Sequence, residues 1–279
     1  MDLWYSEYHV DDVRLSINVE REIYSHHTEY QHIAILDSKE FGRILTLDGE
    51  LISTEKDEFF YSEMMVHVPM AVQPEIKKVL VIGGCDGGVL KELCKYQTIE
   101  HIDVVELDAQ LVQICQQFFP PTTEAFQDAR VHLSIQDALK FVRRKEDEYD
   151  LIIVDSANPF GVNESLFTRE FYGSCYNALK ANGTLISQHA NAFYKEDEEA
   201  FMHIRNRLTS VFEQNDVYLA SIPTYAAGYL LFGYSSKQSH PLNDLKAKQW
   251  EELAIPTKFY NVALHQGAFA LPNYIKELM

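Results

Sequence analysis

The chain has 279 residues, of which 46% are hydrophobic, so it is long enough and apolar enough to bury a sizeable core. Its formal charge is −18, from 42 acidic and 24 basic residues. Such a field repels nucleic acid and anionic membrane surfaces and attracts cations, so we expect neither a nucleic-acid partner nor a membrane partner.

The N-terminal residues MDLWYSEYHVDD lack the basic and apolar regions of a secretory signal, and no run of 18 uncharged apolar residues follows. The four cysteines lie far apart without a C-x-x-C pair, which fits reduced thiols in the cytoplasm. His26 and His27 are adjacent, a poor spacing for ligands, and the other histidines are scattered, so we expect no metal site. These features predict a cytoplasmic, soluble protein.

Residues 1–55 have the pattern of β-structure. LSINVEREIY alternates between apolar and polar residues, and QHIAILDS and GRILTLDGELIST follow, interrupted by turn residues such as Asp48-Gly49. Residues 57–68 place Phe60, Met64 and Val68 on one helical face, and a connection between Pro69 and Pro74 is expected to end that helix. We therefore expect two packed units, 1–55 and 56–279.

From residue 77 onward, apolar runs alternate with helix-like stretches. The runs are KVLVIGG, IDVVELD, RVHLSIQD, DLIIVDS and GTLISQHA, and the stretches include GGVLKELCKYQ and AQLVQICQQFF. This rhythm predicts an α/β fold with a parallel, doubly wound sheet. Two later runs, within SVFEQNDVYLASIPTY and GYLLFGYSS, fit antiparallel strands at its edge.

The strand ends are informative because ligands of open α/β sheets bind beyond the carboxyl ends of the strands. The first strand is followed by GGCDGG (83–88), whose glycines let the backbone approach a ligand and open a helix. Asp86 in that loop disfavours a phosphate and favours a nucleoside. Glu106, about 20 residues on, has the offset of an acid that binds ribose hydroxyls. The next three strand ends carry Asp137, Asp155 and Gln188.

Each of these acids could instead be a helix N-cap, which stabilises helices through the same oxygens. Acids at four strand ends in succession are harder to explain in that way. Together they predict a negatively charged crevice suited to a cationic ligand such as a sulfonium nucleoside, with Asp137 accepting from an exocyclic amine.

The sequence resembles the spermidine synthase family, the polyamine aminopropyltransferases, over nearly its whole length. The similar segments are WYSE (4–7), TEYQHI (28–33), LDGELISTEKDEFFYSEM (47–64), GGCDGG, VVELD, VDS, ESLFTREFY (164–172), IPTYAAG (222–228) and ALHQGAFALPNYI (263–275). The resemblance implies a Rossmann-like methyltransferase-type sheet, a small N-terminal antiparallel β-domain, and assembly as a homodimer or homotetramer.

The resemblance also implies the reaction and the residues that carry it. The family transfers the aminopropyl group of decarboxylated S-adenosylmethionine, its co-substrate, to putrescine, giving spermidine and 5′-methylthioadenosine without a metal or further cofactor. Asp155 matches the family's catalytic aspartate. The implied donor site comprises Gln31, Gly83, Asp86, Glu106, Asp137 and Ala138, with Asp86 at the amino end of the transferred group. The implied amine site comprises Tyr61, Ser62, Asp86, Asp155, Asn158, Gln188 and Tyr225.

Four positions depart from the usual family pattern. Cys85 replaces a loop glycine, Ser62 stands where His or Gln is usual, Asn158 replaces an acid, and Val162 replaces a proline. Asn158 removes a charge from the place where relatives hold the substrate amine, so the substrate is in question while the chemistry of Asp155 is not. The acceptor could be agmatine or cadaverine, or the donor could be S-adenosylmethionine with its carboxylate intact.

Two other classes of function remain open. A small-molecule methyltransferase would use the same strand ends but would need no acid-lined channel for a polyamine. A non-catalytic polyamine-binding protein would need the acids and tyrosines without Asp155. For Tyr61 and Tyr225, core packing is the ordinary alternative, because the chain has 16 tyrosines.

Overall fold

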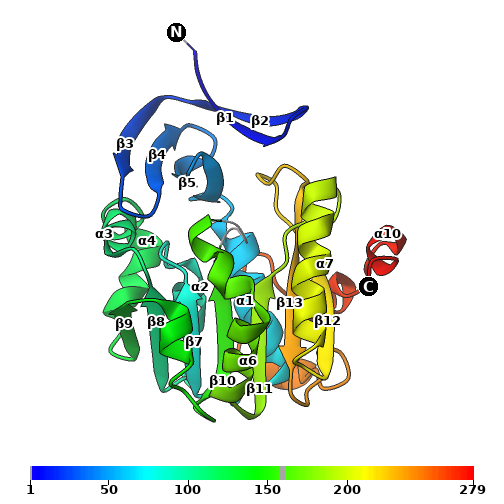
Figure 1. Cartoon of the computed structure of the whole chain (residues 1–279). Coiled ribbons are helices and arrows are strands. Elements are labelled where there is room, and N and C mark those ends of the chain that lie inside the picture. Colours follow the sequence, from blue (N-terminus) through cyan, green and yellow to red (C-terminus); the bar gives the residue numbers. More distant parts are fainter. Residues whose placement is uncertain (1, 157–160) are drawn as a thin grey trace.

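The computed structural model describes residues 2–156 and 161–279, with side chains left undescribed at 161–163. Its N-terminal part is a layer of antiparallel strands that lies across one end of the larger α/β unit (Figure 1). The strands are β1 (Leu3–Val10), β2 (Val13–Val19), β3 (Arg21–His27), β4 (His32–Ser38), β5 (Gly42–Leu47) and β6 (Glu50–Thr54). β1 and β2 form a hairpin, and β3 to β6 form a four-stranded sheet in chain order.

Two sequence expectations for this part have different outcomes. The turn at Asp48-Gly49 is confirmed, because both residues have positive φ and join β5 to β6 in a tight hairpin. The predicted β-structure over LSINVEREIY is confirmed but divides into two strands, because Glu20 separates β2 from β3 and each strand pairs in a different sheet. β2 has buried residues at Ile17 and Val19, whereas no residue of β3 is buried, and the sequence alternation does not mark the break between them.

Within the described residues, the larger unit is built on a seven-stranded sheet of order β12-β13-β11-β10-β7-β8-β9. Its strands are β7 (Lys78–Gly83), β8 (His101–Glu106), β9 (Val131–Ile135), β10 (Tyr149–Asp155), β11 (Leu179–Gln188), β12 (Gln214–Ser221) and β13 (Tyr229–Ser236). The first five are parallel, and β13 pairs antiparallel with both β11 and β12. The predicted doubly wound sheet with antiparallel strands at its edge is thus confirmed.

Helices cover both faces of this sheet (Figure 1). They are α1 (Glu58–Val72), α2 (Gly88–Cys94), α3 (Ala109–Phe118), α4 (Pro120–Thr123), α5 (Ala138–Val142), α6 (Arg169–Ala178), α7 (Lys195–Thr209), α8 (Ala247–Glu252), α9 (Val262–Ala268) and α10 (Asn273–Lys276), with short 3₁₀ helices η1 (Glu124–Gln127) and η2 (Gly161–Phe167). Alternate residues of a strand enter different cores: Leu151 and Ile153 of β10 pack with α1 and α2, whereas Ile152 and Val154 pack with α6 and α7.

Helix α1 differs from the sequence expectation at its C-terminal end. A helix ending before Pro69 is wrong, because α1 continues to Val72 with Pro69 inside it. Proline removes one backbone hydrogen bond from a helix. Here residues 62–72 are all buried, so packing on every side of the final turns offsets that loss.

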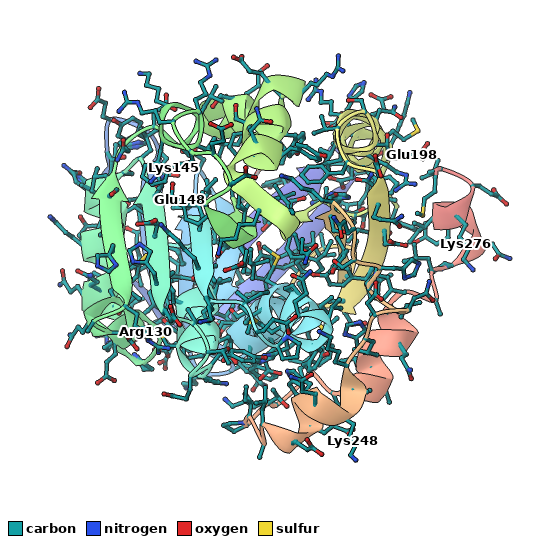
Figure 2. The ribbon with its side chains drawn as sticks, turned by 90° about the horizontal axis from the view of Figure 1, so that it is seen from below. Arg130, Lys145, Glu148, Glu198, Lys248 and Lys276 are labelled. Carbon is teal, nitrogen blue, oxygen red and sulfur yellow. The ribbon has the colours of Figure 1, made fainter. Side chains whose placement is uncertain are left out.

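Charged side chains occupy the outside of the larger unit. Seen from the side opposite the N-terminal layer, the labelled residues Arg130, Lys145, Glu148, Glu198, Lys248 and Lys276 lie around its periphery (Figure 2). A search of the described helices finds none that is long and apolar enough to cross a membrane.

Candidate active site

A pocket lies between the N-terminal layer and the carboxyl ends of β7, β8, β10 and β11. The chain leaves β7 to form β8 on one side and later returns to form β10 on the other, so this is the switch point where open α/β sheets bind ligands. Leu47, Ile52 and Ser53 of the N-terminal layer close the pocket from the opposite side. Both units of the chain are therefore needed to form it.

The sequence-predicted site residues come together here. Eleven of the twelve line this single pocket, namely Gln31, Tyr61, Ser62, Gly83, Asp86, Glu106, Asp137, Ala138, Asp155, Gln188 and Tyr225. The twelfth, Asn158, lies outside the described residues, so its place in the site stays a prediction. The shared location is consistent with one site for donor and amine, while the individual roles stay predictions.

Asp155 ends β10 at the base of the pocket. Tyr61 of α1 donates its hydroxyl proton to Oδ1 of Asp155 at an O···O distance of 2.8 Å. Burial raises the pKa of the Asp155 carboxyl to about 7, and the charges of Asp86 and, more weakly, Glu106 add to that rise, while the bond from Tyr61 opposes it. A carboxyl group with this pKa can exchange a proton near neutrality.

The loop glycines leave room for Asp155. Gly83 pairs with Asp155 across the parallel strands, and the backbone N–H of Gly84 donates to the Asp155 carbonyl at 3.1 Å. A Cβ on Gly83, whose φ is +83°, would lie 2.1 Å from that carbonyl oxygen. A Cβ on Gly84 would lie 2.9 Å from Oδ2 of the Asp155 side chain. Any other residue at either position would displace the acid.

Three further acids bind backbone amides at the starts of helices or turns. Asp86 Oδ1 accepts from Gly88 N at 3.2 Å, and Asp137 Oδ1 accepts from Lys140 N at 2.9 Å. Glu106 Oε1 accepts from the two amides that follow it, at 2.7 and 3.0 Å. The capping alternative therefore holds for Asp137, the N-cap of α5, whereas the N-caps of α2 and α3 are Gly87 and Asp108. Each carboxylate has a second oxygen, and all three residues line the pocket.

The electrostatics of this wall favour a cation. Glu106 is buried, and that burial raises the pKa of its carboxyl against the lowering effect of its two backbone hydrogen bonds. Asp86, Asp137 and Asp155 lie in the same pocket. Glu106 and Asp155, whose charged forms are disfavoured by burial, gain the most from a bound positive charge.

Asp108 is a lining residue that the sequence analysis missed. Its Oδ1 caps α3, and its Oδ2 accepts from Thr28 Oγ1 at 2.7 Å and from Gln31 Nε2 at 3.3 Å. It thereby fixes Gln31, which comes from the N-terminal layer, over the end of β8. An N-cap signal was present in the sequence, because Asp108 stands directly before the apolar helix pattern that begins at Ala109.

The amine side of the pocket has aromatic and polar walls. Tyr225 donates its hydroxyl proton to the Ile52 carbonyl at 3.3 Å, which ties the segment after β12 to the N-terminal layer. Tyr61 packs edge-on against Phe232 at a centroid distance of 5.3 Å. Both tyrosines thus pack in the core and also face the pocket, so the packing and substrate interpretations are compatible.

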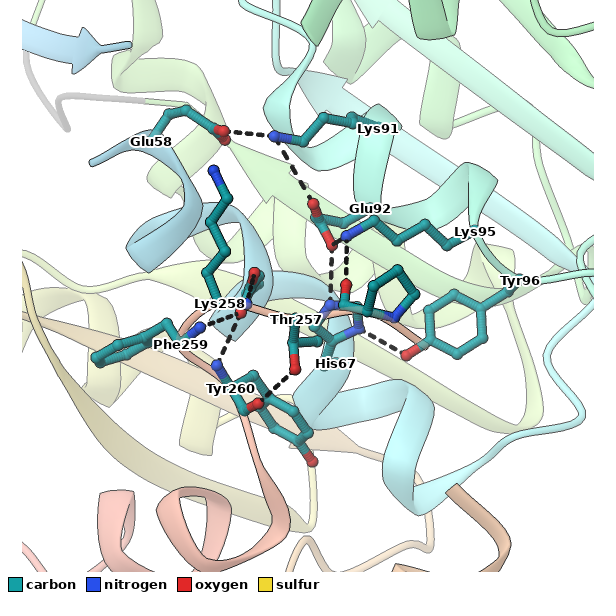
Figure 3. Close-up of polar contacts among 12 residues, drawn as sticks. Glu58, His67, Lys91, Glu92, Lys95, Tyr96, Thr257, Lys258, Phe259 and Tyr260 are labelled. Carbon is teal, nitrogen blue, oxygen red and sulfur yellow. Dashed lines mark hydrogen bonds and ion pairs between the residues drawn. The ribbon is translucent and has the colours of Figure 1, made fainter. Parts of the chain in front are cut away.

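Asp57 and Glu58 also line the pocket and were missed. Asp57 accepts from Thr54 Oγ1 at 2.5 Å and from Thr224 Oγ1 at 2.6 Å, so it joins β6 to the segment after β12. Glu58 pairs with Lys91 of α2 (Figure 3). Both acids stand at the start of a helical pattern, where helix capping was the simpler explanation. A search of the described residues finds no cluster of three or more His, Cys, Asp or Glu side chains that could hold a metal ion.

Comparisons with known proteins agree over the whole chain. Residues 58–247 match the model of the spermine/spermidine synthase domain, and residues 3–55 match that of the spermidine synthase tetramerisation domain. The chain is 52% identical to a polyamine aminopropyltransferase of Clostridium beijerinckii and 51% identical to one of Alkaliphilus oremlandii. Each alignment covers 100% of this chain and 98% of the relative.

Two solved structures are also similar. A spermidine synthase in complex with the transition-state analogue AdoDATO superposes with a TM-score of 0.96 at 36% identity, over 99% of this chain and 94% of the other. The spermidine synthase of Thermotoga maritima superposes with a TM-score of 0.94, with the same identity and coverage.

Proposed function

This chain belongs to the spermine/spermidine synthase family, and from that premise we propose how its pocket transfers an aminopropyl group from decarboxylated S-adenosylmethionine to putrescine. The products are spermidine and 5′-methylthioadenosine. The observation that carries the proposal is Asp155, a carboxyl with a pKa of about 7 at the end of β10, in a pocket with Asp86, Glu106 and Asp137.

The reaction needs a neutral amine beside a sulfonium ion. A primary alkyl ammonium with a lysine-like pKa of ~10.4 must lose a proton to expose its lone pair, which at pH 7 costs about 4.6 kcal/mol. The lone pair then forms an N–C bond to the methylene next to sulfur, and the C–S bond breaks with its electrons left on sulfur. The sulfur thereby becomes a neutral thioether, and the positive charge moves to the new secondary ammonium, so one proton is released in all.

Asp155 is suited to accept the proton that the primary ammonium loses. Its pKa near 7 leaves a substantial fraction ionised at neutral pH, and the carboxylate can orient the attacking ammonium before it takes the proton. Tyr61 fixes the carboxylate through the 2.8 Å bond to Oδ1, which leaves Oδ2 to face the substrate. Holding the amine in line with the C–S bond supplies the remaining acceleration.

We assign the nucleoside to the side of the pocket beneath the N-terminal layer. Glu106 would bind the ribose hydroxyls, Asp137 and Ala138 the adenine, and Gln31, held by Asp108, would close over them. Gly83 would lie under the sulfonium region, and Asp86 would bind the amino end of the transferred chain. In this arrangement the donor lies across the ends of β8 and β7, and its sulfur comes close to Asp155 at the end of β10.

The acceptor would occupy the side lined by Tyr61, Ser62, Gln188 and Tyr225. The tyrosine rings can cover its methylenes and interact with its distant ammonium. Asn158 is assigned to the same side on the resemblance alone, and its neutral amide makes the acceptor amine the quantity to measure first.

The test is a matrix of donors and amines analysed by mass spectrometry. Decarboxylated and intact S-adenosylmethionine are each incubated with putrescine, cadaverine and agmatine. We expect 5′-methylthioadenosine and spermidine from the decarboxylated donor with putrescine. S-adenosylhomocysteine as the leaving nucleoside would indicate methyl transfer instead. Tight polyamine binding without any product would indicate a binding protein.

We also propose a homo-oligomeric assembly in the cytoplasm. The match of residues 3–55 to a tetramerisation domain supports an oligomer, either a dimer or a tetramer, and Trp4 and Tyr8 of β1 are exposed at 56% and 72%. The free thiols of all four cysteines fit a reducing compartment. We place the domain boundary at residues 55 and 56. Light scattering of the purified chain distinguishes dimer from tetramer.

A further inference from the structure

Asp57 uses both oxygens of its carboxylate to join segments that lie far apart in the chain. Its Oδ1 accepts from Thr54 Oγ1 at 2.5 Å, and its Oδ2 accepts from Thr224 Oγ1 at 2.6 Å. These O···O distances are typical of a hydroxyl that donates to a carboxylate, and such bonds are about twice as strong as bonds between neutral groups. All three side chains are buried, so both bonds are shielded from water.

Helix capping does not account for this acid. Asp57 stands at the N-cap position of α1, where an acidic side chain ordinarily accepts from backbone amides of the first turn. Within the described residues its side chain makes no such bond, and the helix begins instead with a bond from Phe60 N to the Asp57 carbonyl at 3.0 Å. The carboxylate of Asp57 therefore serves the two threonine bonds.

The segment beyond Thr224 carries one wall of the proposed amine site. Residues 222–228 join β12 to β13, and their backbone hydrogen bonds close on the segment itself. Ile222 N donates to the Gly228 carbonyl at 3.0 Å, and Gly228 N donates to the Tyr225 carbonyl at 2.8 Å. Because these bonds are internal, the segment would move as a unit, and the contacts of its side chains decide where it lies.

Thr224 makes the shorter of two hydrogen bonds that place this segment. The hydroxyl of Tyr225 donates to the Ile52 carbonyl at 3.3 Å, which is longer than the upper limit of about 3.0 Å that is usual between two oxygens. The bond from Thr224 to Asp57 is 2.6 Å long. Since Thr224 and Tyr225 are adjacent, Asp57 contributes more to the position of Tyr225 than the bond of its own hydroxyl does.

The opposite wall starts from the same acid. Tyr61 lies in α1, the helix that Asp57 begins, and it donates to Asp155 at 2.8 Å. Tyr61 and Tyr225 both line the pocket and pack against the same apolar cluster. Asp57 is therefore connected to both aromatic walls, to one through the helix backbone and to the other through Thr224.

We propose that Asp57 is a positioning residue for the acceptor, which acts by binding Thr224 and so holding Tyr225 in the wall of the amine side. The distance between this wall and Tyr61 sets the width available to the diamine. The inference rests on the proposed function. Loss of the bond to Thr224 releases the segment and weakens amine binding, while the donor side at the ends of β7 and β8 is unaffected.

The test removes one threonine bond at a time and leaves the carboxylate in place. In Thr224→Val we expect the KM for putrescine to rise about tenfold or more, as is typical when a hydrogen bond to a charged group is lost. The Kd for 5′-methylthioadenosine, measured by isothermal titration calorimetry, should stay the same. The value of kcat at saturating putrescine should fall by a smaller factor than the KM rises.

Thr54→Val is the matched control. Thr54 donates an equivalent buried bond to the same carboxylate, but it comes from β6 and does not line the pocket. We expect both threonine variants to lose stability to a similar degree in urea denaturation. The KM for putrescine should rise only in Thr224→Val, which separates a positioning role from a merely structural one.

A double-mutant cycle provides a second measurement. Asp57→Ala removes both bonds, so adding Thr224→Val to it should raise the KM for putrescine no further. If Asp57→Ala does not fold, the comparison of the two threonine variants still decides the question.

Four results would overturn the positioning role of Asp57. They are an equal rise of the putrescine KM in both threonine variants, an unchanged KM in Thr224→Val, additive effects in the double variant, and a loss of 5′-methylthioadenosine affinity as large as the rise in KM. An unchanged KM in Thr224→Val together with a raised KM in Asp57→Ala would make Asp57 a direct ligand of the amine. Failure of the proposed function is distinct, because the native protein itself would then release no 5′-methylthioadenosine from any donor and amine.

Discussion

Replacing Asp155 by Asn removes the proposed proton acceptor while keeping its size and its bond from Tyr61. General-base catalysis contributes typically ~10²–10⁴-fold to a rate, so we expect kcat at pH 7.5 to fall by about that factor. Formation of 5′-methylthioadenosine from saturating donor and putrescine measures the loss. Glu75→Gln is the control, because Glu75 pairs with Lys246 on the surface and does not line the pocket.

The pH dependence separates loss of a base from general damage. Asp155 is active when ionised, so the native kcat/KM should rise about tenfold per pH unit below its pKa of about 7 and level off above it. In Asp155→Asn only amine that is already neutral in solution can react. Its residual rate should therefore continue to rise tenfold per unit toward the amine pKa of ~10.4.

The same substitution should stabilise the unliganded protein. The folded-state pKa of Asp155 rises from 3.8 to about 7, so between these pH values the unfolded chain releases a proton that the folded chain keeps. Stability falls across that window and stays low above it. A difference of roughly 3 pKa units corresponds to about 4 kcal/mol. Asp155→Asn should regain much of that free energy of unfolding at pH 8 and none near pH 4, as measured by urea denaturation.

Two outcomes would refute this reasoning about Asp155. One is a variant that keeps more than a tenth of the native rate at pH 7.5. The other is a native profile with no change of slope near pH 7, combined with equal stabilities of variant and native protein at pH 8. The first result would exclude Asp155 as the base, and the second would exclude a raised pKa of Asp155.

Three further predictions concern neighbouring features. Tyr61→Phe removes a donor to the charged form of Asp155, so the acid limb of the pH–rate profile should move up by about one unit; a shift downward would contradict the geometry. Gly83→Ala places a Cβ 2.1 Å from a backbone oxygen and should lower the free energy of unfolding by more than about 3 kcal/mol. Gly173→Ala, in an open position of α6, should raise the free energy of unfolding by up to ~1 kcal/mol in the same denaturation assay. The pKa of His9 is raised to about 9 by its bonds to α7 and β1, so its contribution to holding the N-terminal hairpin is complete below pH 6.5 and lost as the pH rises through about 9. The protection of β1 amides from hydrogen exchange, relative to their intrinsic rates, should therefore fall over that range in the native protein. In His9→Gln this protection should be low and independent of the His9 titration.

Much of the fold follows from local pattern. The five parallel strands appear in the sequence as apolar runs because they are buried on both faces, and acids at their ends mark the pocket. The continuation of α1 through Pro69 was not predictable, because it depends on side chains from distant segments that bury the last turns of the helix. The break at Glu20 was hidden for a similar reason, since pairing partners decide where one sheet ends and another begins.

Some residues of the site could also be predicted from the sequence, and others could not. Asp86, Glu106 and Asp155 could be proposed from strand ends, but Glu58 could not be distinguished from a helix-capping acid. Only its position in space shows that Lys91 engages one oxygen and that the other is buried without a hydrogen-bond partner in the described part of the chain. Which of two equivalent oxygens lacks a partner is a property of packing between α1 and α2, and no spacing along the chain encodes it.

The glycines of the loop after β7 are required for two reasons. The sequence favours Gly83 and Gly84 as places where backbone approaches a ligand. The structure adds that a Cβ on either would collide with Asp155, which lies about 70 residues later in the chain. Because β7 and β10 are neighbours in the sheet, the two motifs form one unit, in which the acid can occupy the strand end only if the adjacent strand ends without side chains. Substitutions in the loop should therefore impair proton transfer at Asp155 as well as donor binding.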